Sequence, residues 1–211
     1  MLAALGILAA AAFLESGPDA STWLRLVTKP VPVLCLAAWV AVGARGSASR
    51  LFCAGLLFSA LGDWLLERSP DLFLAGLIAF LAAHLAYLVA FLLETRRPCV
   101  GRALPFALWA AIGYVAMRPG LGSMAGPVLV YLTAIAAMMW RAAAGVGRDG
   151  AARTAEGLAL LGAVLFGASD TLIGLDRFRA PIDGVHVPIM LSYWLGQLGI
   201  AASAVADHEP R

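Results

Sequence analysis

A succession of apolar segments, separated only by short stretches rich in charged residues, proline and glycine, constrains this chain more than any other feature. A helix needs about 20 apolar residues to cross the hydrocarbon core of a bilayer. The fourth, seventh and eighth segments reach that length, whereas the first, third and fifth are short. The pattern predicts an all-α membrane protein, a compact bundle of about eight transmembrane helices, over residues 1–14, 22–44, 51–66, 72–93, 102–118, 124–141, 154–175 and 185–206.

The composition favours a single transmembrane helical domain over residues 1–211. Apolar residues make up 62% of the chain and charged residues 13%, with a mean hydropathy of +0.87. A soluble domain is about half apolar and about a quarter charged. The net charge of +2 forms no basic stripe with interleaved aromatic residues, so we expect no nucleic-acid partner. Residues 1–14 lack the basic start of a signal peptide, and we interpret them as the first span.

The arginines of the predicted loops are distributed unevenly. The second, fourth and sixth loops hold eight arginines, and the other loops hold four. Cytoplasmic loops of membrane proteins carry an excess of lysine and arginine. We therefore expect the even loops to be cytoplasmic and, with eight helices, both termini as well. The composition, rich in alanine, glycine and arginine, suits a multi-pass protein of the bacterial inner membrane.

Three ionisable residues, Asp63, His84 and Asp170, lie within the predicted helices. A charged side chain at the bilayer centre costs about 2.5–3.5 kcal/mol on insertion scales, so such residues usually serve a function. Asp63 follows an apolar run that continues beyond it, although an aspartate near a helix end can also be merely interfacial. A lone histidine on an apolar face is often only a packed core residue, but at mid-span its titration near neutral pH favours a role in proton transfer. We predict that all three are functional.

Lys29 stands immediately before Pro30-Val31-Pro32, early in the second predicted helix. Two prolines in three residues remove backbone donors and bend or delay a helix. The lysine either extends its ammonium group to the outer interface or is held by the distorted turn and directed at a phosphate or a carboxylate inside the bundle. Both interpretations are open from the sequence.

Further polar side chains accompany these residues at helical spacing. Ser59 lies one turn before the first aspartate, Tyr87 one turn after the histidine, and Tyr193 and Gln197 share a face of the last helix. At 1.5 Å per residue, both aspartates, the lysine and Tyr193 fall in the outer half of the membrane, and the histidine and Gln197 nearer the midplane. This common depth predicts a shared cavity, although Tyr193 and Gln197 can also serve only to join helices.

At these positions the chain resembles the YhhN-like lysoplasmalogenase family of multispanning membrane proteins. The resemblance implies hydrolysis of the vinyl ether bond of a lysoplasmalogen, a lysophospholipid of the membrane. The products would be a fatty aldehyde and glycerophosphocholine or glycerophosphoethanolamine. The matching pieces occur in the expected order over nearly the whole chain. They are Thr28-Lys29-Pro30, Ser59-Ala60-Leu61-Gly62-Asp63, Phe80 with His84-Leu85-Ala86-Tyr87, Phe166 with Ser169-Asp170, and Tyr193 with Gln197.

Acid-catalysed cleavage of a vinyl ether needs one protonated carboxyl group as general acid and a nearby carboxylate to stabilise the cation and deprotonate water. Two aspartates in a shared cavity of low dielectric suit these roles. We therefore expect Asp63 and Asp170 to form the acid/base pair, without deciding which is the acid, and His84 to move protons between them. Lys29 suits the substrate phosphate. The expected substrate-binding set is Lys29, Ser59, Tyr87, Tyr193 and Gln197.

A divalent metal held by Asp63, His84 and Asp170, with an open position for water, is the mechanistic alternative. No second histidine lies in the middle of a predicted span, so such a site would be unusually rich in carboxylates. We expect neither a metal nor another cofactor.

Two other classes of function compete with a hydrolase. A proton-coupled transporter or channel also uses intramembrane aspartate, histidine and lysine, but such folds commonly contain inverted repeats and paired broken helices. Here only the segment around Lys29 looks broken. A non-catalytic assembly protein explains glycines such as Gly162 and Gly167 but not the charged residues within the spans. The oligomeric state is open from the sequence.

Overall fold

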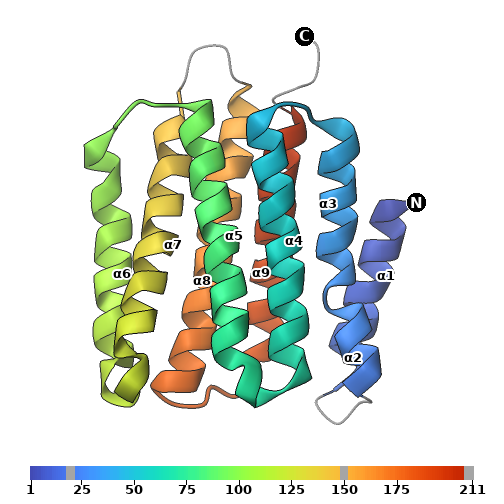
Figure 1. Cartoon of the computed structure of the whole chain (residues 1–211), viewed down its shortest axis with the longest axis vertical. Coiled ribbons are helices and arrows are strands. Elements are labelled where there is room, and N and C mark those ends of the chain that lie inside the picture. The colour runs from blue at the N-terminus through green and yellow to red at the C-terminus, as the bar shows by residue number, and fades with distance from the viewer. Residues whose placement is uncertain (18–21, 148–151, 207–211) are drawn as a thin grey trace.

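The computed structural model describes residues 1–17, 22–147 and 152–206, and these ranges contain helices and turns but no strand. Seven helical segments are long and apolar enough to cross a membrane, and α1 is a shorter apolar helix (Figure 1). The predicted all-α bundle is therefore confirmed. The helices are α1 (Leu2–Glu15), α2 (Thr22–Thr28), α3 (Val31–Gly43), α4 (Ser47–Arg68), α5 (Phe73–Glu94), α6 (Leu104–Met117), α7 (Ala125–Gly145), α8 (Arg153–Phe178) and α9 (His186–Ala206).

Two predicted segments differ from the observed helices in length. The segment predicted at 51–66 is the helix α4, with 22 residues, because polar residues at both ends complete its terminal turns. Helix α6 has only 14 residues, but short 3-10 turns at Val100–Ala103 and Arg118–Gly120 extend the segment to 21 residues. Both segments are thus long enough to span a bilayer.

The proline pair interrupts the second predicted helix. Helix α2 ends at Thr28 and α3 begins at Val31, with Lys29 and Pro30 in the turn between them. Pro30 cannot donate a backbone hydrogen bond, and its carbonyl accepts the first bond of α3, from the amide of Leu34 at 3.0 Å. Together the two helices form one segment, Trp23–Gly43, long enough to span a membrane.

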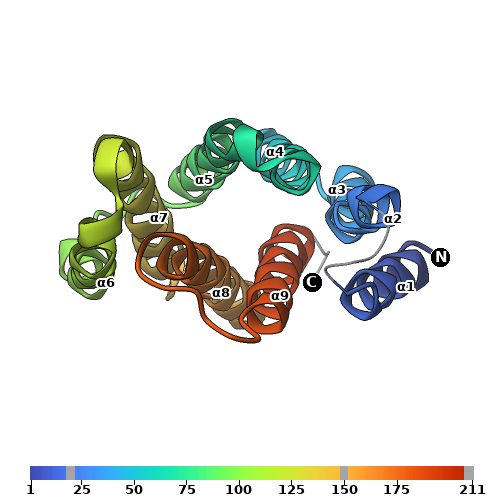
Figure 2. The same ribbon diagram turned by 90° about the horizontal axis from the view of Figure 1, so that it is seen from below.

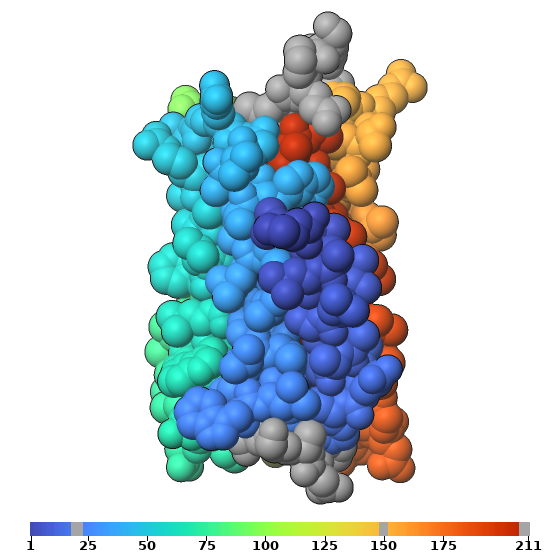
Figure 3. All heavy atoms as spheres, turned by 90° about the vertical axis from the view of Figure 1, so that its right-hand side faces the viewer, coloured from blue at the N-terminus to red at the C-terminus, as the bar shows by residue number. Residues whose placement is uncertain are grey.

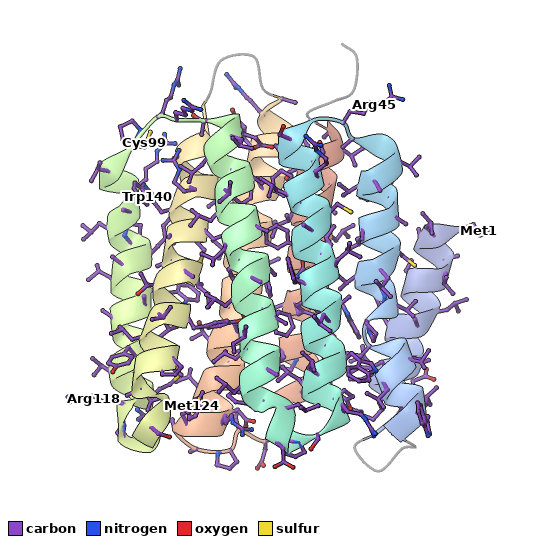
Figure 4. All side chains as sticks on the ribbon, in the orientation of Figure 1. Met1, Arg45, Cys99, Arg118, Met124 and Trp140 are labelled. Carbon is purple, nitrogen blue, oxygen red and sulfur yellow. The ribbon has the colours of Figure 1, made fainter. Side chains whose placement is uncertain are left out.

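Seen along the helix axes, α3, α4, α5, α7, α8 and α9 follow one another around a common centre (Figure 2). Helix α6 packs outside this ring against α7, and α1 packs outside it against α3. In the space-filling view the N-terminal helices lie against α3 on the outer surface (Figure 3). Side chains fill the space between the helices, with Arg45 and Arg118 near opposite ends of the bundle (Figure 4).

The outward faces of these helices are apolar, as a lipid environment requires. Large apolar side chains with more than half of their surface exposed include Val42, Ile78, Ile112, Val115, Leu161 and Leu195. The buried interior, by contrast, contains Ser59, Asp63, His84, Asp170 and Gln197. An apolar exterior around a partly polar interior supports an integral, multi-pass membrane protein.

Helices α8 and α9 approach each other through glycines. A methyl group added at Gly162 would lie 2.6 Å from the backbone nitrogen of Ile200 and 2.7 Å from the carbonyl oxygen of Gly196. Backbone atoms cannot yield as a flexible side chain does, so only hydrogen fits at position 162. Small residues of this kind allow close helix packing in membranes, and here they bring the polar faces of α8 and α9 to the centre of the bundle.

Substitution Gly162→Ala is expected to destabilise the protein by about 1–3 kcal/mol, the usual cost of overpacking a close contact, and to lower its melting temperature in detergent. Gly157→Ala on the same helix is the matched control, because a methyl group there meets nothing within 4 Å. Equal melting temperatures for the two variants would contradict the account of α8–α9 packing.

Candidate functional site

Asp170, on α8, receives two polar side chains from neighbouring helices. The Tyr131 hydroxyl on α7 donates a hydrogen bond to Asp170 Oδ2 at 2.5 Å, and His84 Nε2 on α5 lies 3.3 Å from the same oxygen. His84 is completely buried, and Asp170 and Tyr131 are nearly so. Three helices therefore converge on one carboxyl oxygen in the interior of the bundle.

The hydrogen bonds around His84 fix where its protons lie. Nδ1 is 2.7 Å from the carbonyl oxygen of Phe80, and because a carbonyl only accepts, Nδ1 must donate. In a neutral imidazole Nε2 is then a bare acceptor, which a carboxylate at 3.3 Å would repel. The close approach is favourable when the pair carries one further proton, either as an imidazolium beside a carboxylate or as a carboxylic acid beside a neutral imidazole. Nε2 has no aligned hydrogen-bond partner among the described residues, as is common before a substrate is bound.

Asp63, on α4, has a separate partner on α9. The Tyr193 hydroxyl donates a hydrogen bond to Asp63 Oδ2 at 2.7 Å, and both side chains are buried. Each aspartate thus has one tyrosine, and the two pairs face a common interior.

A third set of polar side chains joins α4, α5 and α9 next to these pairs. The Tyr87 hydroxyl donates to Gln197 Oε1 at 2.7 Å, and Gln197 Nε2 donates to Ser59 Oγ at 2.9 Å. All three residues have no exposed surface. These bonds satisfy the polar groups of the amide within the protein, as burial in a membrane requires.

Two phenylalanines lie between the pairs. The Phe166 ring stacks on the His84 ring, with centroids 4.4 Å apart, and lies 5.6 Å from the Tyr193 ring. The Phe80 ring makes an edge contact with Tyr193 at 5.8 Å. The aromatic rings hold the histidine in place and keep the surroundings of both carboxyl groups apolar.

An apolar pocket reaches Asp170 and Tyr131 from the end of the bundle where α4 ends and α5 begins. The cavity within it has a volume of about 40 Å³. This is much less than the roughly 300–1,000 Å³ of sites that enclose a drug-sized molecule, so the pocket has room for only part of a larger ligand. The remaining wall is apolar and includes Leu66, Phe73, Leu77, Phe80, Met117 and Phe178.

Lys29 lies in an ion-pair cluster at the same end of the bundle. Glu67, one helical turn after Asp63, bonds Lys29 Nζ at 3.1 Å through Oε2 and Arg25 Nε at 2.5 Å through Oε1. Lys29 therefore bonds a carboxylate, as the second interpretation expects, but it does so at the end of the bundle, where the first interpretation places it. A contact with a substrate phosphate stays a prediction.

The structure brings most of the predicted site residues together. The two carboxyl groups lie in the interior of the bundle with their partners His84 and Tyr193. The adjoining hydrogen-bonded set consists of Ser59, Tyr87 and Gln197. Ser169 and Thr171 do not bond the Asp170 side chain, because their hydroxyls donate to the carbonyls of Ile189 and Gly167. Which of these residues act in catalysis or contact a substrate stays a prediction.

Sequence reasoning did not single out Tyr131, Arg25 or the pairing of Glu67, and it named Phe166 only as part of the family resemblance. A usable signal existed for Tyr131, since it lies six residues after the start of α7, and Tyr193 lies seven after the start of α9. Their equal depth indicates a shared layer. For Phe166 the resemblance was the only signal, because the composition of an apolar helix does not distinguish one phenylalanine from another.

A metal held by Asp63, His84 and Asp170 would require these three side chains to converge on one point. Within residues 1–17, 22–147 and 152–206, no three histidine, cysteine, aspartate or glutamate side chains gather as metal ligands would. Asp63 bonds Tyr193, whereas His84 faces only Asp170 of the two aspartates. The arrangement is that of two separate carboxyl–tyrosine pairs rather than a preformed three-ligand centre.

Comparison with known proteins identifies the family. The model of the YhhN family matches residues 24–204, which include every residue of the site. The chain belongs to the YhhN family. No solved structure matches the chain.

Several curated relatives carry the name lysoplasmalogenase. The chain is 36% identical over 201 residues to lysoplasmalogenase TMEM86A of Bos taurus, covering 90% of this chain and 81% of that protein. It is 32% identical over 197 residues to lysoplasmalogenase TMEM86B of Homo sapiens, covering 92% and 80%. It is also 36% identical over 166 residues to a lysoplasmalogenase of Mycobacterium bovis, covering 74% and 61%.

The geometry predicts that Tyr131 stabilises the buried Asp170 carboxyl group. Substitution Tyr131→Phe removes the hydroxyl donor and is expected to lower stability by about 1–3 kcal/mol, because the carboxyl oxygen loses a partner it cannot replace with bulk water. Thermal unfolding in detergent measures the effect. The matched control is Tyr114→Phe on the peripheral helix α6, and an equal shift for both variants would contradict the prediction.

Proposed function

We propose that this YhhN-family member is a membrane-embedded hydrolase that cleaves the vinyl ether bond of a lysoplasmalogen. The observation that carries the proposal is the close approach of His84 Nε2 to the buried Asp170 carboxyl group, at 3.3 Å, beside an apolar pocket. Relatives named lysoplasmalogenase, matching most of this chain, support the substrate class. The apolar pocket suits part of a hydrocarbon chain, and a buried acid suits the reaction.

The proposed reaction begins with transfer of a proton to the β-carbon of the vinyl ether. The double bond supplies the electron pair, and an oxocarbenium ion forms at the α-carbon and the ether oxygen. Water adds to the α-carbon and loses a proton to a base, giving a hemiacetal. The hemiacetal then collapses: its hydroxyl loses a proton, the bond to the ether oxygen breaks, and that oxygen takes up a proton. The products are a fatty aldehyde and the glycerophospho-headgroup.

Asp170 is the proposed general acid. Its carboxyl group lines the pocket, Tyr131 orients it, and His84 supplies the proton. General acid–base catalysis by a positioned side chain contributes about 10²–10⁴-fold to a rate. The Phe166 ring, stacked on His84, excludes water that would otherwise accept this proton.

Asp63 is the proposed carboxylate that stabilises the cation and deprotonates the attacking water. The Tyr193 hydroxyl donates to it as the Tyr131 hydroxyl donates to Asp170, so the tyrosines do not distinguish the two carboxyl groups; the distinction rests on His84, which lies beside Asp170. Two carboxyl groups in different surroundings are the usual basis of an acid/base division of labour. The set Ser59, Tyr87 and Gln197 borders this region and is proposed to orient the glycerol hydroxyl.

We further propose that the protein resides in a bacterial inner membrane with its arginine-rich end in the cytoplasm. That end holds Arg45, the connection between α5 and α6, the end of α7, the start of α8 and the C-terminal end of α9 (Figures 1 and 4). The excess of arginine at this end supports the orientation. Both aspartates then lie in the outer half of the membrane.

Substitutions Asp63→Asn and Asp170→Asn are each expected to reduce aldehyde release by at least about 10²-fold, while the yield of folded protein stays near that of the native sequence. The assay incubates purified protein in detergent with a lysoplasmalogen and traps the aldehyde as a hydrazone. Asp71→Asn, in the exposed connection between α4 and α5, is the matched control and should retain full activity.

Full activity in either site variant would remove that aspartate from the mechanism. Absence of aldehyde from the native protein, together with substrate-dependent proton flux in liposomes, would instead support the transporter interpretation.

Prolonged dialysis against a chelator is expected to leave the rate of aldehyde release unchanged, because the proposed proton transfers use only protein side chains. Metal analysis of the dialysed protein provides the control. Loss of activity that a divalent ion restores would contradict the metal-free mechanism and favour a metal at Asp63, His84 and Asp170.

A further inference from the structure

The cluster of Arg25, Lys29 and Glu67 joins two cations through a single carboxylate at the end of the bundle. We propose that this cluster is a recognition site for a zwitterionic phospholipid headgroup: the substrate phosphate takes the place of Glu67 on Arg25 and Lys29, and the released Glu67 carboxylate pairs with the headgroup ammonium. The identity of the substrate is taken from the proposed function, and the new element is the set of residues that bind its headgroup.

The two cations already bind an anionic group. Glu67 uses one oxygen for each, Oε1 for Arg25 and Oε2 for Lys29. A phosphodiester presents two anionic oxygens in a similar fork, so it can make the same two contacts. Arg25 Nη1 also donates to the carbonyl oxygens of Ser16 and Gly17, at 3.3 and 3.4 Å, so the guanidinium stays in place when the carboxylate leaves.

Charge favours exchange rather than simple addition. Two cations and one carboxylate leave the cluster with an excess of one positive charge, and a phosphodiester that replaces the carboxylate preserves this balance. The displaced Glu67 would then be an unpaired anion near lipid, which is costly. An ammonium group attached to the same phosphate supplies its partner, so a zwitterionic headgroup satisfies all three side chains and a headgroup without an amine does not.

The cluster is partly accessible, as a ligand site must be. The exposed fraction is 12% for the Lys29 and Arg25 side chains and 14% for Glu67. The Phe13 ring forms one wall, 4.3 Å from the guanidinium carbon of Arg25, and the exposed ring of His186 lies 5.3 Å from Phe13. Glu67 is the penultimate residue of α4, so the cluster lies at the depth of lipid headgroups rather than of acyl chains.

The spacing between this cluster and the proposed catalytic centre fits one lipid molecule. Asp63 and Glu67 are separated by one turn of α4, about 6 Å along the helix axis. In a lysoplasmalogen, the three-carbon glycerol unit separates the phosphate from the vinyl ether oxygen. A phosphate at the cluster therefore places the reactive bond near Asp63, one turn deeper in the membrane.

The test measures binding of ligands that cannot be cleaved, so that it does not depend on turnover. The probes are 1-O-alkyl lysophosphoethanolamine, 1-O-alkyl lysophosphoglycerol and 1-O-alkyl glycerol, which share a saturated ether chain and differ in the headgroup. Affinity for the purified full-length protein in detergent is measured by ligand-dependent thermal stabilisation. The native protein is expected to bind the ethanolamine probe about tenfold more tightly than the phosphoglycerol probe, as for one charge-assisted hydrogen bond.

Substitutions separate the two halves of the site. Glu67→Gln should remove the preference for the ethanolamine headgroup, because the neutral amide cannot pair with the ammonium. Lys29→Gln and Arg25→Gln should weaken both phosphate-bearing probes about tenfold or more without affecting alkyl glycerol. Lys29→Arg keeps the charge and should retain phosphate binding, so that loss of charge is distinguished from loss of folding. Glu15→Gln and Arg68→Gln, exposed at the same end of the bundle, are the matched controls.

A headgroup preference that survives in Glu67→Gln, or phosphate binding unchanged in both cation variants, would overturn the proposal. The aldehyde assay is read separately. Headgroup-selective binding without aldehyde release would reject the hydrolase while leaving the headgroup site in place, whereas aldehyde release without headgroup selectivity would reject only the site.

Discussion

The requirement that an ionisable group buried among membrane helices be satisfied by another side chain shapes the interior of this protein. Asp63 and Asp170 each receive a tyrosine hydroxyl from a different helix, at 2.7 and 2.5 Å. Without these donors Asp63 would lose its hydrogen-bond partner and Asp170 would face only the imidazole of His84, and unsatisfied ionisable groups are costly within a membrane. The tyrosines therefore tie α4 to α9 and α7 to α8, and the same bonds that permit burial of the carboxyl groups also orient them.

The packing of the helices and of the aromatic rings supports this arrangement of the two carboxyl groups. Glycines bring α8 and α9 into backbone contact, which places Tyr193 opposite α4. The Phe166 and Phe80 rings fill the space between the carboxyl groups, and an apolar pocket approaches Asp170 from one end of the bundle. Under the proposed function, the charged cluster around Glu67 holds the headgroup at the membrane interface, and the aspartates meet the vinyl ether one turn deeper.

Much of this organisation could be predicted from the sequence, because the bilayer makes both apolar length and buried charge informative. Hydropathy located the helices, and the cost of burying Asp63, His84 and Asp170 marked the residues that meet in the interior. The proline pair located the break between α2 and α3. The partners of the buried and charged side chains could not be predicted, because the sequence does not say which helices are neighbours. Only the helix packing showed that Tyr131 bonds Asp170 and that Glu67 bonds Lys29. The resemblance included Phe166, but its stacking on His84 also emerged only from the helix packing.

The central claim is that a carboxylic acid of the protein protonates the β-carbon of a vinyl ether. Turnover of a lysoplasmalogen in D₂O, with immediate trapping of the aldehyde and mass spectrometry, tests it most directly. The account predicts one deuterium on the carbon next to the aldehyde carbonyl, at a position set when the oxocarbenium ion forms. An aldehyde without deuterium at that carbon would show that the bond breaks by another route and would contradict the account.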